Sequence, residues 1–267
     1  MKKIKKILII SGNLLKHKFT AIKLLKKFNN SNIIFENYPK YINENFKKDK
    51  TSPIIKHFKK LKLFEKIYFN KFCNKNRIYL KKKTIYEINK GKINNKKIKN
   101  DIKKLNPDLI VLNATSLLSK TFIKSFKGTI INIHAGLMPY YRGAGCNVWT
   151  FYNKELEYTG VTIHFVNEKI DDGNIILQSQ SNFEKNDNTH TIGCKNAKLS
   201  AKLCIDSIKF LQNNPKFKGK KISTKKNNIF FKKDFNKKII EKINFLIQNG
   251  LVIKYCLNKK KIKIIKY

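Results

Sequence analysis

The chain has 267 residues, 41% of them hydrophobic and 12% aromatic, which suits a folded protein with a sizeable core and excludes wholesale disorder. Its formal net charge is +42, and nearly all of the positive residues are lysines. Two interpretations stay open: a surface for nucleic acid, or compositional bias, because the lysines run the length of the chain and form no separate basic arm. Nonspecific nucleic-acid binding at low salt follows from either interpretation.

The cysteines indicate a reduced protein without a disulfide framework. They are odd in number and form no CxxC pair: Cys73, Cys146, Cys194, Cys204 and Cys256. Cys146 has no adjacent base in the sequence, so we expect a small residue that lines a site and not a nucleophile. No run approaches the roughly 18 apolar residues of a membrane span. We therefore expect a cytoplasmic protein without a membrane partner or a metal site.

The N-terminal residues predict the start of a parallel α/β sheet. Residues 4–10 form a short, β-branched run that stops at Ser11, Gly12 and Asn13, and a helical pattern of apolar residues follows. The turn contains one glycine and is therefore no dinucleotide fingerprint. An anionic substrate could still bind at the start of the helix, which makes these three turn residues candidate substrate ligands.

The remaining elements predict an α/β fold: a Rossmann-like open, mostly parallel sheet flanked by helices, with a small C-terminal α/β appendage. Residues 38–83 are charged, aromatic and helical in pattern, and we interpret them as a helical insertion. Helices are expected near residues 95–105, 187–211 and 237–248, and a short strand at LVIKY, residues 251–255. Further strands are expected at residues 32–35, 84–88, 109–112, 129–133, 159–166 and 175–180. The predicted domains are residues 1–212 and 213–267.

Polar residues follow three of these strands. Asn113 begins a small polar loop after the apolar strand at residues 109–112, and ligands of open α/β sheets bind beyond such strand ends. An ordinary strand-to-helix turn is the alternative for this loop. Asn132 and His134 are two residues apart on a strand and therefore point to the same face. Asp171, in the turn after the strand at residues 159–166, could reach the same rim.

An amide and an imidazole opposite a carboxylate suit acyl transfer. The first two groups can stabilise an oxyanion, and the carboxylate can accept a proton from an attacking amine. The spacing alone does not establish this chemistry, because Asx-Gly turns and isolated Asn-x-His runs are common. His164, on the strand before the turn, is either a satisfied interior histidine or a site-lining one.

The runs NIHAGLMPYYRG and TGVTIHFVNEKIDDGNIILQ resemble the folate-dependent formyltransferase family. Its signature is Asn-x-His, a Leu-Leu-Pro-like turn and a later strand that ends in Asp-x-Gly. Asn132, His134 and Asp171 fall on the family's catalytic residues, and the resemblance covers about residues 105–211. It implies that residues 1–212 form a catalytic domain that uses 10-formyltetrahydrofolate as formyl donor and needs no metal. In the implied mechanism Asn132 and His134 stabilise the oxyanion, and Asp171 accepts or relays the proton.

The resemblance also implies binding residues. Those expected to bind the folate are Leu112, Asn113, Ala114, Thr115, Leu117 and Asp172. Those expected to bind the acceptor are Ser11, Gly12, Asn13, His17, Arg142 and Gly143. For Arg142 a structural hydrogen-bonding role is the alternative to a contact with a phosphate or carboxylate.

The resemblance leaves several acceptors open. The runs SGNLLKHKF and YYRGAGCNVW look closer to the sugar-modifying branch, and residues 213–267 are shorter than the barrel domain of methionyl-tRNA formyltransferases. The expected function is therefore formyl transfer to an amino sugar or another small amine. Alternative acceptors are methionyl-tRNA and glycinamide ribonucleotide. Formyltetrahydrofolate hydrolysis and non-enzymatic RNA binding on the same scaffold are further alternatives, and no pattern indicates an oligomeric state.

Overall fold

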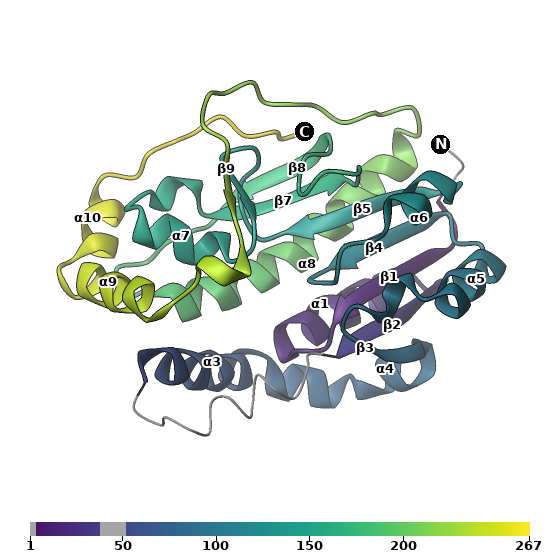
Figure 1. Cartoon of the computed structure of the whole chain (residues 1–267), viewed down its shortest axis with the longest axis horizontal. Helices are drawn as coiled ribbons and strands as arrows, with labels where there is room; N and C mark the ends of the chain where they lie inside the picture. Colours follow the sequence, from purple (N-terminus) through teal and green to yellow (C-terminus); the bar gives the residue numbers. More distant parts are fainter. Residues whose placement is uncertain (1–3, 38–51) are drawn as a thin grey trace.

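A computed structural model describes residues 4–37 and 52–267 (Figure 1). A seven-stranded sheet of order β3-β2-β1-β4-β5-β7-β8 forms its centre. All neighbours from β3 to β5 pair in parallel, whereas β7 is antiparallel to both β5 and β8. The strands are β1 (Ile7–Gly12), β2 (Ser31–Asn37), β3 (Thr84–Asn89), β4 (Leu109–Asn113), β5 (Thr129–His134), β7 (Gly160–Phe165) and β8 (Ile175–Gln180). The expected mostly parallel α/β sheet is confirmed.

Helices cover both faces of this sheet, and the apolar strands explain why. In β1, Ile7 and Ile9 pack toward α1 (Leu15–Lys27) and α8 (Thr189–Asn213), whereas Leu8 and Ile10 pack toward α5 (Lys96–Leu105) and α6 (Lys120–Ser125). Successive side chains of a strand alternate between faces, so a strand buried on both sides must be apolar throughout. Each fully buried Ile or Leu contributes roughly 1.5–3 kcal/mol of transfer free energy.

The strand directions bring the polar strand ends together. The C-terminal ends of β1, β4 and β5 meet at one edge of the sheet, which we call the carboxyl edge. Because β7 reverses the chain direction and β8 reverses it again, β8 runs parallel to β5 and also ends there. The helices that follow β1 and β8, α1 and α8, therefore begin at the same edge as Asn113 and His134.

The region interpreted as an insertion is helical where the structure describes it. It forms α3 (Pro53–Lys75) and α4 (Arg77–Lys83), while residues 38–51 lie outside the described residues. The long helix α3 packs on α1 and α8, with the ring centroids of Phe19 and Phe69 4.9 Å apart. Neither these helices nor any other helix in the two described ranges is long and apolar enough to cross a membrane.

The C-terminal residues pack against the loop after β5. Strand β9 (Asn228–Phe230) pairs with β6 (Tyr141–Gly143), and α9 (Lys237–Gln248) shares a hydrophobic cluster with α7 (Cys146–Tyr152). The helix near residues 237–248 is confirmed. The division into domains at residue 212 stays a prediction.

The strand expected at LVIKY is wrong, because these residues begin helix α10 (Leu251–Leu257). Gly250 precedes the helix in a left-handed conformation, with φ of 79°. Val252 is buried in the same cluster as α9, and Tyr255, three residues later, packs partly against it. Burial of one helical face therefore overrides the β-propensity of Val, Ile and Tyr.

Candidate active site

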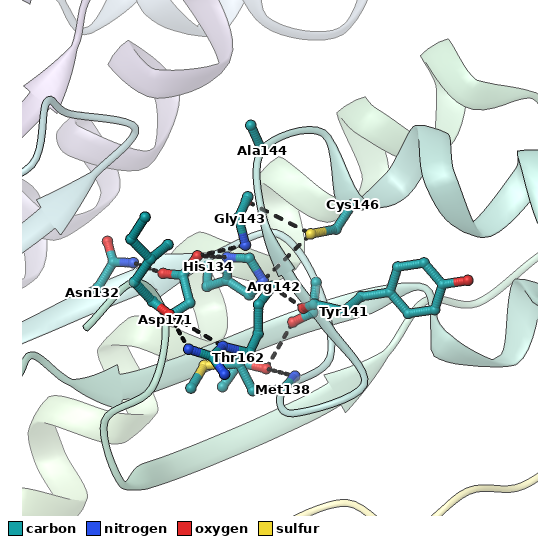
Figure 2. Close-up of polar contacts among 12 residues, drawn as sticks. Asn132, His134, Met138, Tyr141, Arg142, Gly143, Ala144, Cys146, Thr162 and Asp171 are labelled. Atoms are coloured by element: carbon teal, nitrogen blue, oxygen red, sulfur yellow. Dashed lines mark hydrogen bonds and ion pairs between the residues drawn. The ribbon is translucent and has the colours of Figure 1, made fainter. Parts of the chain in front are cut away.

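Three side chains selected from the sequence meet at the carboxyl edge (Figure 2). Asn132 and His134 lie at the end of β5, and Asp171 reaches them from the turn between β7 and β8. The Nδ1 atom of His134 is 3.3 Å from Oδ2 of Asp171, and Asn132 Nδ2 donates to Oδ1 of the same carboxylate over 3.1 Å. One carboxylate therefore contacts both residues of the Asn-x-His pair.

The turn that carries Asp171 packs closely against the end of β7. Asp171 has a φ of 41°, in the left-handed region that non-glycine residues rarely occupy. A Cβ on Gly173 would lie 1.6 Å from the carbonyl oxygen of Phe165, so only glycine permits this close approach. The backbone N–H of Gly143, in the loop after β5, donates to Asp171 Oδ2 over 2.9 Å. These contacts hold the carboxylate in a strained position that faces His134.

His134 and Asp171 form a buried ion pair. Burial lowers the pKa of His134, but the charge of Asp171 and the neighbouring Cys146 outweigh burial and raise the pKa to about 9. Burial raises the pKa of Asp171, but the charge of His134 and contacts with His164 and Gly143 leave that pKa well below its ordinary value. Both ring nitrogens of His134 face acceptors, since Nε2 is 2.9 Å from the carbonyl oxygen of Tyr141. The site therefore holds an imidazolium beside a carboxylate at neutral pH.

Two further side chains belong to this site. His164 is buried, and its Nε2 lies 3.4 Å from Asp171 Oδ1 and 3.2 Å from Asn132 Nδ2. His164 is therefore both buried and site-lining. It lies opposite Asn132 in the pairing of β5 with β7, and this pairing is what places it in the site. Cys146 Sγ lies 3.6 Å from His134 Nε2. In the described part of the chain, no group of His, Cys, Asp and Glu side chains has the arrangement of a metal site.

The end of β4 and the loop after it carry most of the residues expected to bind folate: Leu112, Asn113, Ala114, Thr115 and Leu117. Asn113 is buried and donates to Ser11 Oγ over 3.1 Å, which ties the ends of β4 and β1 together. The buried Glu36, on β2, accepts a hydrogen bond from the backbone N–H of Ser116 over 2.5 Å and so ties the loop to β2. Leu117, in contrast, is 67% exposed. These two hydrogen bonds anchor the loop, while Leu117 presents an apolar side chain to solvent. The folate contacts of the loop stay a prediction.

Four of the expected acceptor ligands lie at the end of β1, in the turn after it and at the start of α1: Ser11, Gly12, Asn13 and His17. A Cβ on Gly12 would lie 2.7 Å from His17 Nδ1, so the glycine leaves room for the imidazole. Burial, followed by Lys16 and Lys90, holds the pKa of His17 well below its ordinary value, so the ring is neutral. Their role in binding an acceptor stays a prediction.

Arg142 and Asp172 brace the turn that carries Asp171. The guanidinium of Arg142 is buried, and its Nε and Nη2 atoms donate to the carbonyl oxygen of Ile170 over 3.1 and 2.5 Å. Its Nη1 atom donates to Oδ1 of Asn227 over 3.0 Å and lies 3.4 Å from Asp172 Oδ1. These contacts favour the structural alternative for Arg142. Asp172, expected to bind folate, faces Arg142. Gly143, expected to bind the acceptor, donates its backbone N–H to Asp171.

Comparison with known proteins shows which family has this sequence pattern. The family model described as formyl transferase matches residues 6–208. A methionyl-tRNA formyltransferase of Caldicellulosiruptor saccharolyticus is 38% identical over 113 residues, which are 42% of this chain and 36% of that protein. Another from Prochlorococcus marinus is 34% identical over 154 residues, 57% of this chain and 46% of that protein. The matches therefore span less than half the length of these curated relatives.

Solved structures share the fold. A sugar N-formyltransferase from Shewanella superposes with a TM-score of 0.57 at 21% identity, covering 86% of this chain and 78% of the other. The phosphoribosylglycinamide formyltransferase of Anaplasma phagocytophilum gives 0.57 at 14% identity, covering 85% and 98%. A formyltransferase of Anoxybacillus kamchatkensis, in complex with a sugar nucleotide and tetrahydrofolate, gives 0.52 at 19% identity over 92% and 93%. Because the family model spans most of the chain, the protein belongs to the formyl transferase family.

Proposed function

We propose that this protein transfers a formyl group from 10-formyltetrahydrofolate to a primary amine. The observation that carries the proposal is the buried contact of His134 with Asp171, which Asn132 joins through the same carboxylate. The bound tetrahydrofolate of the Anoxybacillus kamchatkensis structure supports a folate as the donor.

The proposed chemistry uses the ion pair as a coupled acid and base. A neutral amine attacks the formyl carbon, and the positive charge of His134 stabilises the resulting oxyanion. His134 then gives its proton to the folate nitrogen as the carbon–nitrogen bond to folate breaks. Loss of that charge removes the main cause of the low pKa of Asp171, whose carboxylate can then accept the proton of the newly bound nitrogen.

For the acceptor, two observations favour methionyl-tRNA over the amino sugar expected from sequence. The relatives at 38% and 34% identity, over 42% and 57% of this chain, are methionyl-tRNA formyltransferases. A groove of about 440 Å³ also lies between α3, the start of α8 and α9. We call it the α3–α9 groove. Lys56, Lys59 and Lys60 line it with positive charge, and His57, His190 and Glu241 also line it.

The position of the α3–α9 groove suits an RNA acceptor. His190 is the second residue of α8, which begins at the carboxyl edge, so the groove lies toward the same end of the sheet as His134. Burial, followed by His190 and Lys16, lowers the pKa of His57 to about 4. Exposed lysines around a neutral histidine attract phosphate groups, which dominate the affinity of proteins for nucleic acids.

The test is incubation with 10-formyltetrahydrofolate and, in separate reactions, methionyl-tRNA, an amino-sugar nucleotide and glycinamide ribonucleotide. We expect N-formylmethionyl-tRNA, and its loss in His134→Ala and Asp171→Asn. Formylation of the sugar instead would restore the small-amine acceptor, and release of formate without an amine would indicate the hydrolase. Wild-type protein that neither binds folate nor formylates any amine would refute the enzyme assignment.

A further inference from the structure

Residues 258–267, which we call the tail, run from α10 along the outer side of β8, the last strand of the sheet (Figure 1). The backbone N–H of Gln178, on β8, donates to the carbonyl oxygen of Ile265 over 2.9 Å. The tail also contacts the chain that follows β5, because the hydroxyl of Tyr140 donates to the carbonyl oxygen of Lys263 over 3.0 Å. The tail therefore lies against both β8 and the chain that leads out of the candidate active site.

The side chain of Gln178 joins the tail to the interior of the protein. It is 1% exposed, and both ends of its amide have partners. Its Oε1 atom accepts the backbone N–H of Ile265 over 3.1 Å, while Nε2 donates to the carbonyl oxygen of Met138 over 2.7 Å and to Oγ1 of Thr162 over 2.9 Å. A backbone N–H only donates and a carbonyl oxygen only accepts, so these partners define which end of the amide faces each side.

Thr162, on β7, continues this connection. Its buried hydroxyl donates to the carbonyl oxygen of Gly136 over 2.7 Å. The same hydroxyl accepts the backbone N–H of Met138 over 3.1 Å (Figure 2). With Gln178 as a second donor, the hydroxyl uses its one hydrogen and both of its lone pairs. Buried hydrogen bonds therefore connect the tail to residues 136–138.

Residues 136–143, which we call the β5–β6 segment, carry backbone groups that contact the buried ion pair. The carbonyl oxygen of Tyr141 lies 2.9 Å from Nε2 of His134. The backbone N–H of Gly143 donates to Oδ2 of Asp171 over 2.9 Å. A shift of this segment would move both partners of the ion pair's contacts at once, and misplacement by about 1 Å can lower a rate by about a hundredfold.

We propose that Gln178 is a positioning residue for formyl transfer, through which the tail holds the β5–β6 segment against the buried ion pair. The assignment rests on the proposed formyl transfer. The tail contributes by selecting the orientation of the amide, because the N–H of Ile265 attracts the amide oxygen. If the amide turned over, its oxygen would face the carbonyl oxygen of Met138, and the two acceptors would repel each other. The segment would then lose the hydrogen bond that holds it to β8.

Gln178→Met tests this role, because methionine has a similar length and lacks the amide. We expect kcat for formyl transfer to fall by about tenfold, with little change in KM for the folate. Gln180→Met is the matched control on the same strand. Gln180 also contacts the tail, but its partners are the carbonyl oxygens of Glu157 and Lys260, which lie outside the β5–β6 segment. The control should keep nearly the wild-type kcat, and equal losses in the two variants would overturn the proposal.

Ile265→Pro tests the contribution of the tail, because proline lacks the N–H that donates to Gln178. Alone it should lower kcat about as much as Gln178→Met does. Combined with Gln178→Met it should cost nothing further, since both substitutions remove the same connection. Lys261→Pro, at an exposed position of the tail, controls for the general effect of proline and should keep the wild-type kcat. Additive losses would mean that the tail acts by another route, and would overturn the proposal.

A spectroscopic measurement separates positioning from a general loss of stability and needs no turnover. The amide proton of Gly143 donates to the carboxylate of Asp171, so its resonance should lie downfield in wild-type protein and in Gln180→Met. In Gln178→Met and in Ile265→Pro it should move upfield, while the amide protons of β1 and β4 keep their positions. A loss of stability alone leaves the shifts of the folded state unchanged, so an unmoved Gly143 resonance in these variants would overturn the proposal. Absence of formyl transfer by wild-type protein would instead refute the proposed function, which this spectrum does not measure.

Discussion

At the scale of single residues, the site depends on a charge pair that the protein keeps out of water. His134 is 5% exposed, and its imidazolium is held by an acceptor at each ring nitrogen. Breaking such a pair by removing one partner leaves an uncompensated buried charge. The stability of the protein should therefore report the protonation of His134 directly.

The pKa of His134 predicts how the free energy of unfolding changes with pH. It is raised from 6.5 to about 9, so the pair's contribution is fully present below pH 6.5 and is lost as the pH rises through 9. The expected loss across this window is on the order of 3 kcal/mol. The low pKa of Asp171 changes the free energy of unfolding in the opposite direction. Its contribution is present above the ordinary pKa of a carboxylate and is lost as the pH falls below it.

Urea unfolding of wild-type protein and His134→Gln at pH 5, 6.5, 8 and 9.5 measures this contribution. The wild type should lose stability between pH 6.5 and 9.5 by more than the variant does. His57→Gln is the matched control, because the pKa of His57 is about 4 and its titration lies outside this window. Parallel curves for wild type and His134→Gln would show that the histidine carries no charge in the folded protein.

At the scale of elements, the turn between β7 and β8 is held in place by its fit against β7. Gly173→Ala would place a Cβ 1.6 Å from the Phe165 carbonyl oxygen, which is part of the backbone and cannot rotate away. We expect roughly 1–3 kcal/mol of destabilisation. Formyl transfer should also fall about a hundredfold, because the displaced turn carries Asp171 away from His134.

The same substitution elsewhere should have the opposite effect on stability. Gly193 lies in α8, and a Cβ there would meet no atom within 4 Å. Gly193→Ala should therefore raise the free energy of unfolding by up to about 1 kcal/mol through helix propensity and leave formyl transfer unchanged. Thermal unfolding and turnover of both variants check the contrast, and equal effects of the two substitutions would show that the close contact at Gly173 is not decisive.

The elements also show how far the sequence predicts this molecule. The buried strands and the polar residues at their ends are predictable from the sequence. Apolar runs identify the strands, and the parallel topology places Asn132, His134 and Asp171 at one edge of the sheet. The pairing of β6 with β9 is not, because three-residue strands leave no periodicity to detect. Nor does the sequence reveal that Arg142 is bound internally, since its partners Ile170 and Asn227 come from distant loops. Local pattern predicts the strand ends, and contacts between loops decide which of their side chains remain available.

At the scale of the whole molecule, the question is whether the net charge of +42 has a function. Lysines that reflect composition alone would act only through the overall field, wherever they lie. Lysines that bind an acceptor would act at one place. The α3–α9 groove offers the comparison, because Lys56, Lys59 and Lys60 are exposed on α3. On the opposite face of the sheet, α5 also carries exposed lysines, and three of them, Lys97, Lys103 and Lys104, form a matched set.

We expect replacement of the three groove lysines of α3 by Glu to weaken methionyl-tRNA binding and replacement of the matched set on α5 to have little effect. Both variants lower the net charge equally, so they change the overall field to the same extent. The slope of log affinity against log salt should fall by about one for each lysine that contacts a phosphate. Dissociation constants for methionyl-tRNA between 50 and 200 mM salt, about the range over which such contacts weaken, measure this slope. Folate binding serves as the control for folding. Equal loss in both variants would assign the charge to compositional bias, whereas loss confined to α3 would place the RNA beside the start of α8.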